Sequence, residues 1–196
     1  MTTTDTTRWR TIDIVVASVL AVAFGVIFWA WNFVWAATEG AFAFFPPAQS
    51  VIYGIWLLPG VLGGLVIRKP GAAFYCEFLA AFVSVLLGSQ WGAVAILQGA
   101  FQGLGAELGF AAFRYRSFRL PAALISGALA GLAAAIFDQI RYYSELELWS
   151  ARVPIFVITV LSATVIAGAG AWYLTRALAG TGVLDRFPAG RDRALV

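Results

Sequence analysis

Several polar side chains lie inside long apolar stretches of the sequence, where an ionisable group is costly. The clearest are two carboxylates, Glu77 and Asp138, and two amides, Gln98 and Gln102. A central Asp in a hydrocarbon environment costs about 2.5–3.5 kcal/mol on insertion scales. Such groups therefore need partners within the protein or a bound ligand. Carboxylates suit a cation, and amides offer donors and acceptors together, so the set predicts a buried ligand site.

Each of these residues also has a structural interpretation. Gln98 and Gln102 are four apart and share a helical face, so they either bind a polar ring or form a hydrogen-bonded clamp between helices. Asp138 either meets a ligand or pairs locally with Arg141, three residues later. Glu107 lies on the opposite helical face from Gln98, and we interpret it as a structural or partner-contact residue.

Aromatic residues flank the same stretches. Tyr53 and Trp56 begin one apolar span, Gln90 and Trp91 lie in the loop 88–92, and Asn32 sits within a tryptophan cluster. Aromatic faces attract organic cations by roughly 0.5–2 kcal/mol per contact. The structural alternative is that such rings anchor the protein in the lipid headgroup region. We predict that a few of them line a pocket.

The residue types that are missing exclude several kinds of chemistry. The sequence has no His, one Cys (Cys76) and one Lys (Lys69), which Pro70 follows. A His-assisted nucleophile, a His-ligated metal, an internal disulfide and a Cys-based cluster are all excluded. No phosphate loop with a Gly-Lys-Ser or Gly-Lys-Thr ending exists. We therefore expect no catalytic residues, no cofactor and no metal, and any ATP hydrolysis must belong to a partner.

The elements that position these residues are membrane spans. Of 196 residues, 61% are hydrophobic and only 12% are charged, which is about half the charge of a typical soluble domain. A bilayer needs roughly 20 apolar residues per helix. Six spans meet this need, over residues 11–38, 49–67, 72–87, 91–113, 120–142 and 153–178. The prediction is an all-α membrane protein: a six-helix domain over residues 11–178, with tails at 1–10 and 179–196.

The basic residues predict how this domain is oriented. An even number of spans puts both ends on one side. Eleven of the thirteen Lys and Arg residues fall on that side, and only Arg141 and Arg152 fall on the other. Because Lys and Arg remain in the cytoplasm during insertion, we predict a multi-pass protein of the cell (inner) membrane with both termini cytoplasmic. The basic residues then serve topology, and we expect no nucleic-acid partner.

The quoted polar residues also belong to a recognisable pattern. It consists of Ile67-Arg68-Lys69-Pro70-Gly71-Ala72-Ala73, Glu77, Gly88-Ser89-Gln90-Trp91-Gly92, Gln98-Gly99, and Gln102-Gly103-Leu104-Gly105-Ala106-Glu107. This pattern resembles the YkoE family, which are membrane substrate-binding subunits, or S components, of energy-coupling-factor vitamin importers. The resemblance covers about residues 10–178.

The resemblance implies a function and partners. It implies the six-helix S-component fold and capture of thiamine, or its hydroxymethylpyrimidine precursor, from outside the cell. It also implies a transmembrane coupling subunit and cytoplasmic ATPase subunits. S components commonly dock through an Ala-x-x-x-Ala stripe on the first helix, and Ala17 and Ala21 match that spacing. From spacing alone the stripe either packs internally or docks a partner.

The chemistry of thiamine suggests which residues bind it. Its thiazolium is permanently positive and favours a carboxylate or an aromatic face, while its aminopyrimidine favours amides and stacking. The predicted ligand-binding residues are Glu77, Gln90, Trp91, Gln98, Gln102, Asp138, Tyr53 and Trp56. Three alternatives stay open: an S component for another vitamin, an intramembrane lipid-modifying enzyme, and a structural membrane protein without a ligand.

Overall fold

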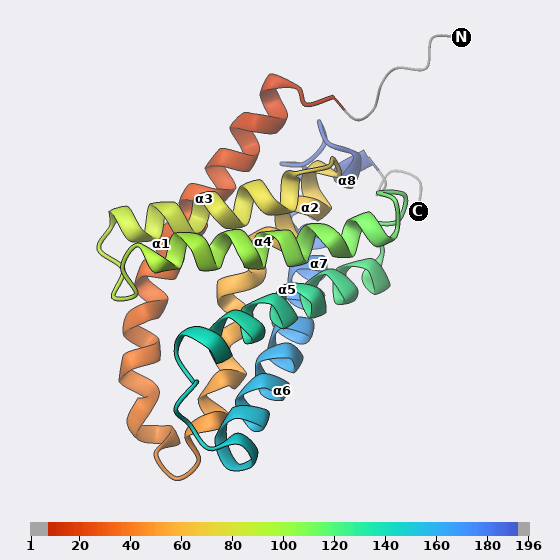
Figure 1. The fold of residues 1–196 in the computed structure, drawn as a ribbon. Coiled ribbons are helices and arrows are strands. Elements are labelled where there is room, and N and C mark those ends of the chain that lie inside the picture. The colour runs from red at the N-terminus through yellow and green to blue at the C-terminus, as the bar shows by residue number, and fades with distance from the viewer. Residues whose placement is uncertain (1–7, 192–196) are drawn as a thin grey trace.

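In the computed structural model, which describes residues 8–191, all regular secondary structure is helical. The elements are α1 (Thr11–Thr38), η1 (Glu39–Phe42), η2 (Pro46–Leu57), α2 (Leu58–Ile67), α3 (Ala72–Leu86), α4 (Val94–Ala112), α5 (Leu120–Arg141), η3 (Leu148–Arg152), α6 (Val153–Ser162), η4 (Ala163–Gly170), α7 (Ala171–Gly180) and α8 (Pro188–Arg191). Several of these run on without a break, so that they form six long rods (Figure 1).

Each rod coincides with one of the six predicted spans. Four rods are long and apolar enough to cross a membrane: Thr11–Phe42, Pro46–Ile67, Leu120–Arg141 and Leu148–Gly180. The helix α3 is a shorter apolar helix. The helix α4 has 19 residues, and its two glutamines and Glu107 lower its hydropathy. These two rods carry the buried Glu77, Ser84 and Gln102.

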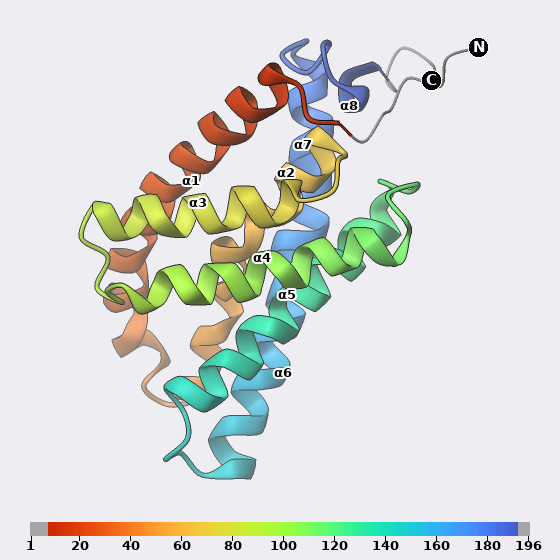
Figure 2. The same ribbon diagram turned by 45° about the horizontal axis from the view of Figure 1, so that its top comes forward.

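The rods pack as a bundle, and the first and last described residues of the chain lie at the same end of it. The helix α4 packs along both α3 and α5, and α1 crosses α3 (Figures 1 and 2). The guanidinium of Arg10 lies over the ring of Phe187, 5.9 Å from its centroid, so the start and the end of the described chain meet at one end of the bundle. We call this the terminal end, and the other the distal end.

Glycine allows a close contact between α4 and α5. A Cβ added at Gly109 of α4 would lie 2.3 Å from the Cα of Ser126 on α5. The Ser126 hydroxyl also donates a 2.7 Å hydrogen bond to the carbonyl of Ala106. Small residues at such crossings let backbones approach, which is how membrane helices gain packing energy in lipid. The α4–α5 pair is thereby held in a fixed register.

The second rod changes its winding halfway along. The segment η2 is a 3₁₀-helix of 12 residues that continues into the α-helix α2. Such a long 3₁₀ run is unusual, and Ser162 supports it. The Ser162 hydroxyl accepts the Gly54 N–H at 2.9 Å and donates to the Val51 carbonyl at 2.7 Å. The last rod is also irregular, with π-helical stretches at η3 and η4.

A carboxylate clamp holds the terminal end of α3. Glu107 of α4 accepts the backbone N–H groups of Gly71, Ala73 and Phe74 at 2.7, 3.0 and 3.2 Å. It also accepts the Tyr115 hydroxyl at 2.6 Å. Burial and the adjacent carboxylate raise the pKa of Tyr115. Glu107 thus satisfies donors that the first turn of a helix leaves free, as its structural interpretation anticipated.

The predicted tails are partly folded. The segment after α7 turns back over the terminal end, where the side chains of Leu184 and Phe187 are buried. At the other tail, Asp13 is buried and bonds Arg10 at 2.7 Å and Lys69 at 2.6 Å. The parts of the predicted tails at 1–7 and 192–196 lie outside the described residues.

Candidate functional site

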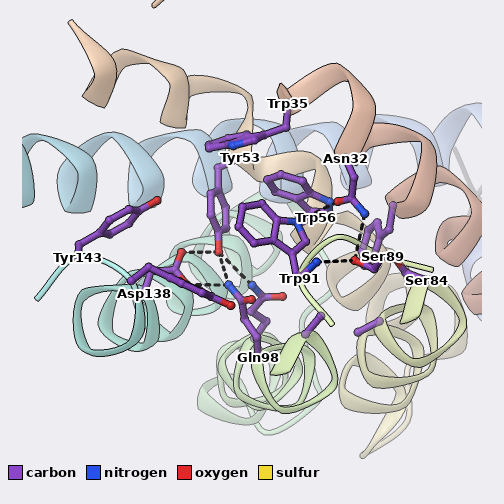
Figure 3. Close-up of a pocket in the computed structure, with 15 residues that line it drawn as sticks. Asn32, Trp35, Tyr53, Trp56, Ser84, Ser89, Trp91, Gln98, Asp138 and Tyr143 are labelled. Atoms are coloured by element: carbon purple, nitrogen blue, oxygen red, sulfur yellow. Dashed lines mark hydrogen bonds between the residues drawn. The ribbon is translucent and has the colours of Figure 1, made fainter. Parts of the chain in front are cut away.

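A pocket opens at the distal end of the bundle, with an empty volume of about 570 Å³ that includes the space at its mouth. Its walls come from α1, η2, α3, α4, α5 and the loops beside them. The lining residues are Phe28, Asn32, Trp35, Tyr53, Trp56, Ala81, Ser84, Ser89, Trp91, Ala95, Gln98, Gln102, Asp138, Tyr142 and Tyr143 (Figure 3).

Asp138 is the centre of a hydrogen-bond network in the pocket wall. The Tyr53 hydroxyl donates to its Oδ2 at 2.7 Å, and the Gln98 amide donates to its Oδ1 at 2.7 Å (Figure 3). Gln98 also donates to the Tyr53 hydroxyl at 2.8 Å, and Gln102 does so at 3.3 Å. Elements far apart in the sequence, η2, α4 and α5, therefore converge on one carboxylate.

Asp138 has no cationic side chain as a partner in the described chain. The ion pairs there join Asp13 to Arg10 and to Lys69, at the terminal end. Arg141 does not pair with Asp138; its guanidinium lies over the Tyr142 ring, 5.3 Å from the centroid. The donors that meet the Asp138 carboxylate are neutral, and the side chain is 3% exposed. A buried acid in this arrangement favours a cation in the pocket.

Aromatic rings form the opposite wall. The Trp56 ring contacts the rings of Trp35, Tyr53 and Trp91 at centroid distances of 5.0, 5.4 and 6.2 Å. In a 3₁₀-helix, residues three apart eclipse one another, so the winding of η2 places Tyr53 and Trp56 on one face. These edge and tilted contacts hold the rings together beside the pocket (Figure 3).

A second network secures the α3–α4 loop. Asn32 of α1 donates to the Ser89 hydroxyl at 3.1 Å and accepts the indole N–H of Trp91 at 3.0 Å. The Gln90 amide donates to the Asn32 backbone carbonyl at 3.4 Å. These bonds tie the loop that carries Trp91 to the end of α1.

The structure brings most of the predicted ligand-binding residues together. Those in the pocket lining are Tyr53, Trp56, Trp91, Gln98, Gln102 and Asp138. Gln90 is outside the lining and holds the loop instead. The prediction omitted Asn32, Trp35, Tyr142 and Tyr143, which do line the pocket. A usable signal existed for Tyr142, because it lies four residues after Asp138 and so shares its helical face.

Glu77 lies outside the lining. It is fully buried, and its Oε2 accepts the N–H of Gly60 at 2.8 Å. Gly60 is in the first turn of α2, just after the 3₁₀ winding of η2 gives way to the α-helix. The carboxyl therefore caps α2 at a junction inside the bundle. The small residues around Glu77 suggested a ligand cavity, but α2 and α4 fill the space beside it. A Cβ added at Gly60 or Gly103 would lie 3.0 or 3.1 Å from the Glu77 side chain.

Ala17 and Ala21 face into the bundle. Neither has exposed surface, and the Cys76 thiol of α3 lies 3.6 Å from the Ala17 carbonyl. In this structure the stripe packs α1 on α3, because small side chains let the two helices approach. The docking role of Ala17 and Ala21 stays a prediction.

Comparisons with known proteins agree with this architecture. The family described as "ABC-type cobalt transport system, permease component" matches residues 12–133. The "Putative HMP/thiamine permease protein YkoE" of Bacillus subtilis (strain 168) is 34% identical over 186 residues, 94% of this chain and 92% of that protein. A solved structure described as "Crystal structure of an S-component of ECF transporter" is 33% identical, with a TM-score of 0.87 over 95% of this chain and 94% of that one.

The chain belongs to the S components of energy-coupling-factor transporters. The predicted all-α membrane fold with six transmembrane helices is confirmed. This S component is a multi-pass membrane protein and the substrate-binding subunit of an importer, not an enzyme, which removes the lipid-modifying alternative. Membership of the family also implies a transmembrane coupling subunit and ATPase subunits as partners.

Proposed function

We propose that this S component captures thiamine from outside the cell, and that the distal pocket is its binding site. The observation that carries the proposal is Asp138, a buried carboxylate that meets neutral donors, opposite a wall of aromatic rings. A flat organic cation satisfies both features at once. The name of the Bacillus subtilis relative, a putative HMP/thiamine permease, supports the same substrate group.

Charge favours thiamine over its hydroxymethylpyrimidine precursor. Two opposite unit charges 4 Å apart interact by about 4 kcal/mol at the effective dielectric constant near a protein surface. Aromatic faces add roughly 0.5–2 kcal/mol per contact with a cation. The neutral precursor gains neither term, although its ring can still use the amides of Gln98 and Gln102. We therefore expect the pocket to bind both compounds and to prefer thiamine.

A bare cobalt ion, which the description of the matched family mentions, suits the pocket less well. The lining offers one carboxylate together with amide and hydroxyl oxygens, and the sequence contains no His. Transition metals favour imidazole or thiolate ligands, usually several together. No group of three or more Cys, Asp and Glu residues that could hold a metal occurs within residues 8–191.

We propose an orientation for the same bundle. Among residues 8–191, nearly all basic residues lie at the terminal end or in the loops beside it, and the pocket lies at the distal end. With the terminal end in the cytoplasm, the pocket mouth faces the outside. This is the arrangement that capture of an external nutrient requires.

Calorimetry on the detergent-purified protein tests the proposal. The ligands are thiamine and its neutral analogue in which carbon replaces the thiazolium nitrogen. We expect the native protein to bind thiamine at least tenfold more tightly than the analogue, or about 1.4 kcal/mol. Asp138→Asn should lose this preference, because it removes the charge and keeps the side-chain shape.

Glu77→Gln is the matched control, since it makes the same chemical change at a buried carboxyl outside the lining. We expect it to keep the preference for thiamine; a loss there would return Glu77 to the list of ligand-binding residues. Equal binding of the two ligands by the native protein would refute the electrostatic argument. A competition panel that includes riboflavin and biotin would separate thiamine from other vitamins.

A further inference from the structure

The hydroxyl of Tyr142 is a polar atom that the pocket leaves without a partner. Within residues 8–191, the buried side-chain atoms that make no hydrogen bond are Tyr142 Oη and Glu77 Oε1. Of these two residues, only Tyr142 lines the pocket. Buried tyrosine hydroxyls usually find a partner, and an exception in a native protein needs an explanation. In a binding pocket, the natural explanation is a polar group of the ligand.

The position of this hydroxyl is fixed by the groups around its ring. The ring lies 5.8 Å from that of Trp91 and 6.4 Å from that of Tyr143, and the Arg141 guanidinium lies over it. The backbone N–H of Tyr142 still bonds the Asp138 carbonyl at 2.8 Å, as in a helix. Tyr142 therefore follows directly after the last residue of α5, about one helical turn beyond Asp138.

Several other polar groups of the pocket are already engaged with one another. Deeper in the pocket, Tyr53, Gln98 and Asp138 hold each other. On the α1 side, Asn32 is bonded to Ser89 and Trp91. A ligand that meets Asp138 with its charge can therefore still gain a new hydrogen bond at Tyr142.

We propose that Tyr142 donates a hydrogen bond to, or accepts one from, the terminal alcohol of bound thiamine, and so selects ligands that carry this group. The inference rests on the proposed function. With the thiazolium at Asp138 and the aminopyrimidine toward the amides of α4, the hydroxyethyl arm extends a few bonds from the cationic ring. A tyrosine hydroxyl suits an alcohol, because each can both donate and accept.

A two-by-two binding experiment tests this assignment. Thiamine and an analogue with ethyl in place of hydroxyethyl are titrated calorimetrically into the native protein and into Tyr142→Phe, which removes one oxygen and keeps the ring contacts. We expect the native protein to bind the analogue about tenfold more weakly than thiamine. Tyr142→Phe should bind thiamine about tenfold more weakly than the native protein does, and should bind the two ligands equally.

Tyr173→Phe is the matched control, because Tyr173 is 62% exposed on α7 and outside the lining. It should bind both ligands as the native protein does. If Tyr142→Phe discriminates between the ligands as well as the native protein does, the assignment of Tyr142 is overturned while thiamine binding stands. If the native protein binds neither ligand, the proposed function has failed, and this inference fails with it.

Discussion

The Glu107 clamp gives a prediction about stability whose size follows from its contacts. Glu107→Ala leaves the N–H groups of Gly71, Ala73 and Phe74 and the hydroxyl of Tyr115 without their acceptor. An unsatisfied buried donor costs about 1–3 kcal/mol. Glu107 is only partly buried, so we take about 1 kcal/mol for each backbone donor. The sum is about 3 kcal/mol, which is a large share of the 5–15 kcal/mol that typically stabilises a domain.

Thermal unfolding in detergent measures this effect. For chains of 150–250 residues, 1 kcal/mol corresponds to about 2–4 °C in Tm, so Glu107→Ala should melt about 6–12 °C below the native protein. Glu107→Gln should lose less, because one side-chain oxygen remains as an acceptor while the charge at the α3 N-terminus is lost.

Glu145→Ala, in an exposed loop at the distal end, is the matched control and should leave Tm within about 1 °C of the native value, as surface changes usually do. If Glu107→Ala has the same Tm as the native protein, the backbone N–H groups at the α3 N-terminus must find other hydrogen-bond acceptors. The clamp would then have no role in holding α3, α4 and the α4–α5 loop together.

Two further predictions concern packing and charge. Gly109→Ala should lower stability by about 1–3 kcal/mol, because its Cβ would overlap the Ser126 backbone. Gly40→Ala is the control and should leave stability unchanged, because no atom lies within 4 Å of the added Cβ. Denaturation of both variants side by side measures the difference, and equal stability would mean that α5 can move aside. Thiamine pyrophosphate should compete at least tenfold less well than thiamine in a binding assay, because its phosphates would enter a pocket that already holds the Asp138 carboxylate and whose lining has no Lys or Arg; equal competition would place the phosphates outside the pocket.

The sequence predicted the features that depend on composition alone. Apolar runs located the six rods, and the first helix begins and ends where its run predicts, at Thr11 and Thr38. Buried polar residues marked Gln98 and Asp138, because membrane insertion makes such residues costly unless they have a partner or a ligand. This cost does not tell whether a polar residue meets a protein partner or a ligand. The sequence therefore could not distinguish Glu77, which caps α2, from Asp138, which lines the pocket.

Features that depend on tertiary contacts were not predictable. The 3₁₀ winding of η2 relies on Ser162, more than 100 residues away, and no local pattern encodes that pairing. The fold of the last residues was missed for a related reason. Leu184 and Phe187 are isolated apolar residues among charges and glycines, which resembles a solvated tail until the exposed end of the bundle is present to bury them.

The winding of η2 also sets how far the second rod extends. Twelve residues rise about 24 Å as a 3₁₀-helix, at 2.0 Å each, but only about 18 Å as an α-helix, at 1.5 Å each. With the ten residues of α2 adding about 15 Å, the rod measures about 39 Å, which exceeds the roughly 30 Å of a hydrocarbon core. Rewinding η2 as an α-helix would shorten the rod by about 6 Å, drawing the Pro46–Pro47 turn toward the lipid and carrying Tyr53 away from the level of Asp138.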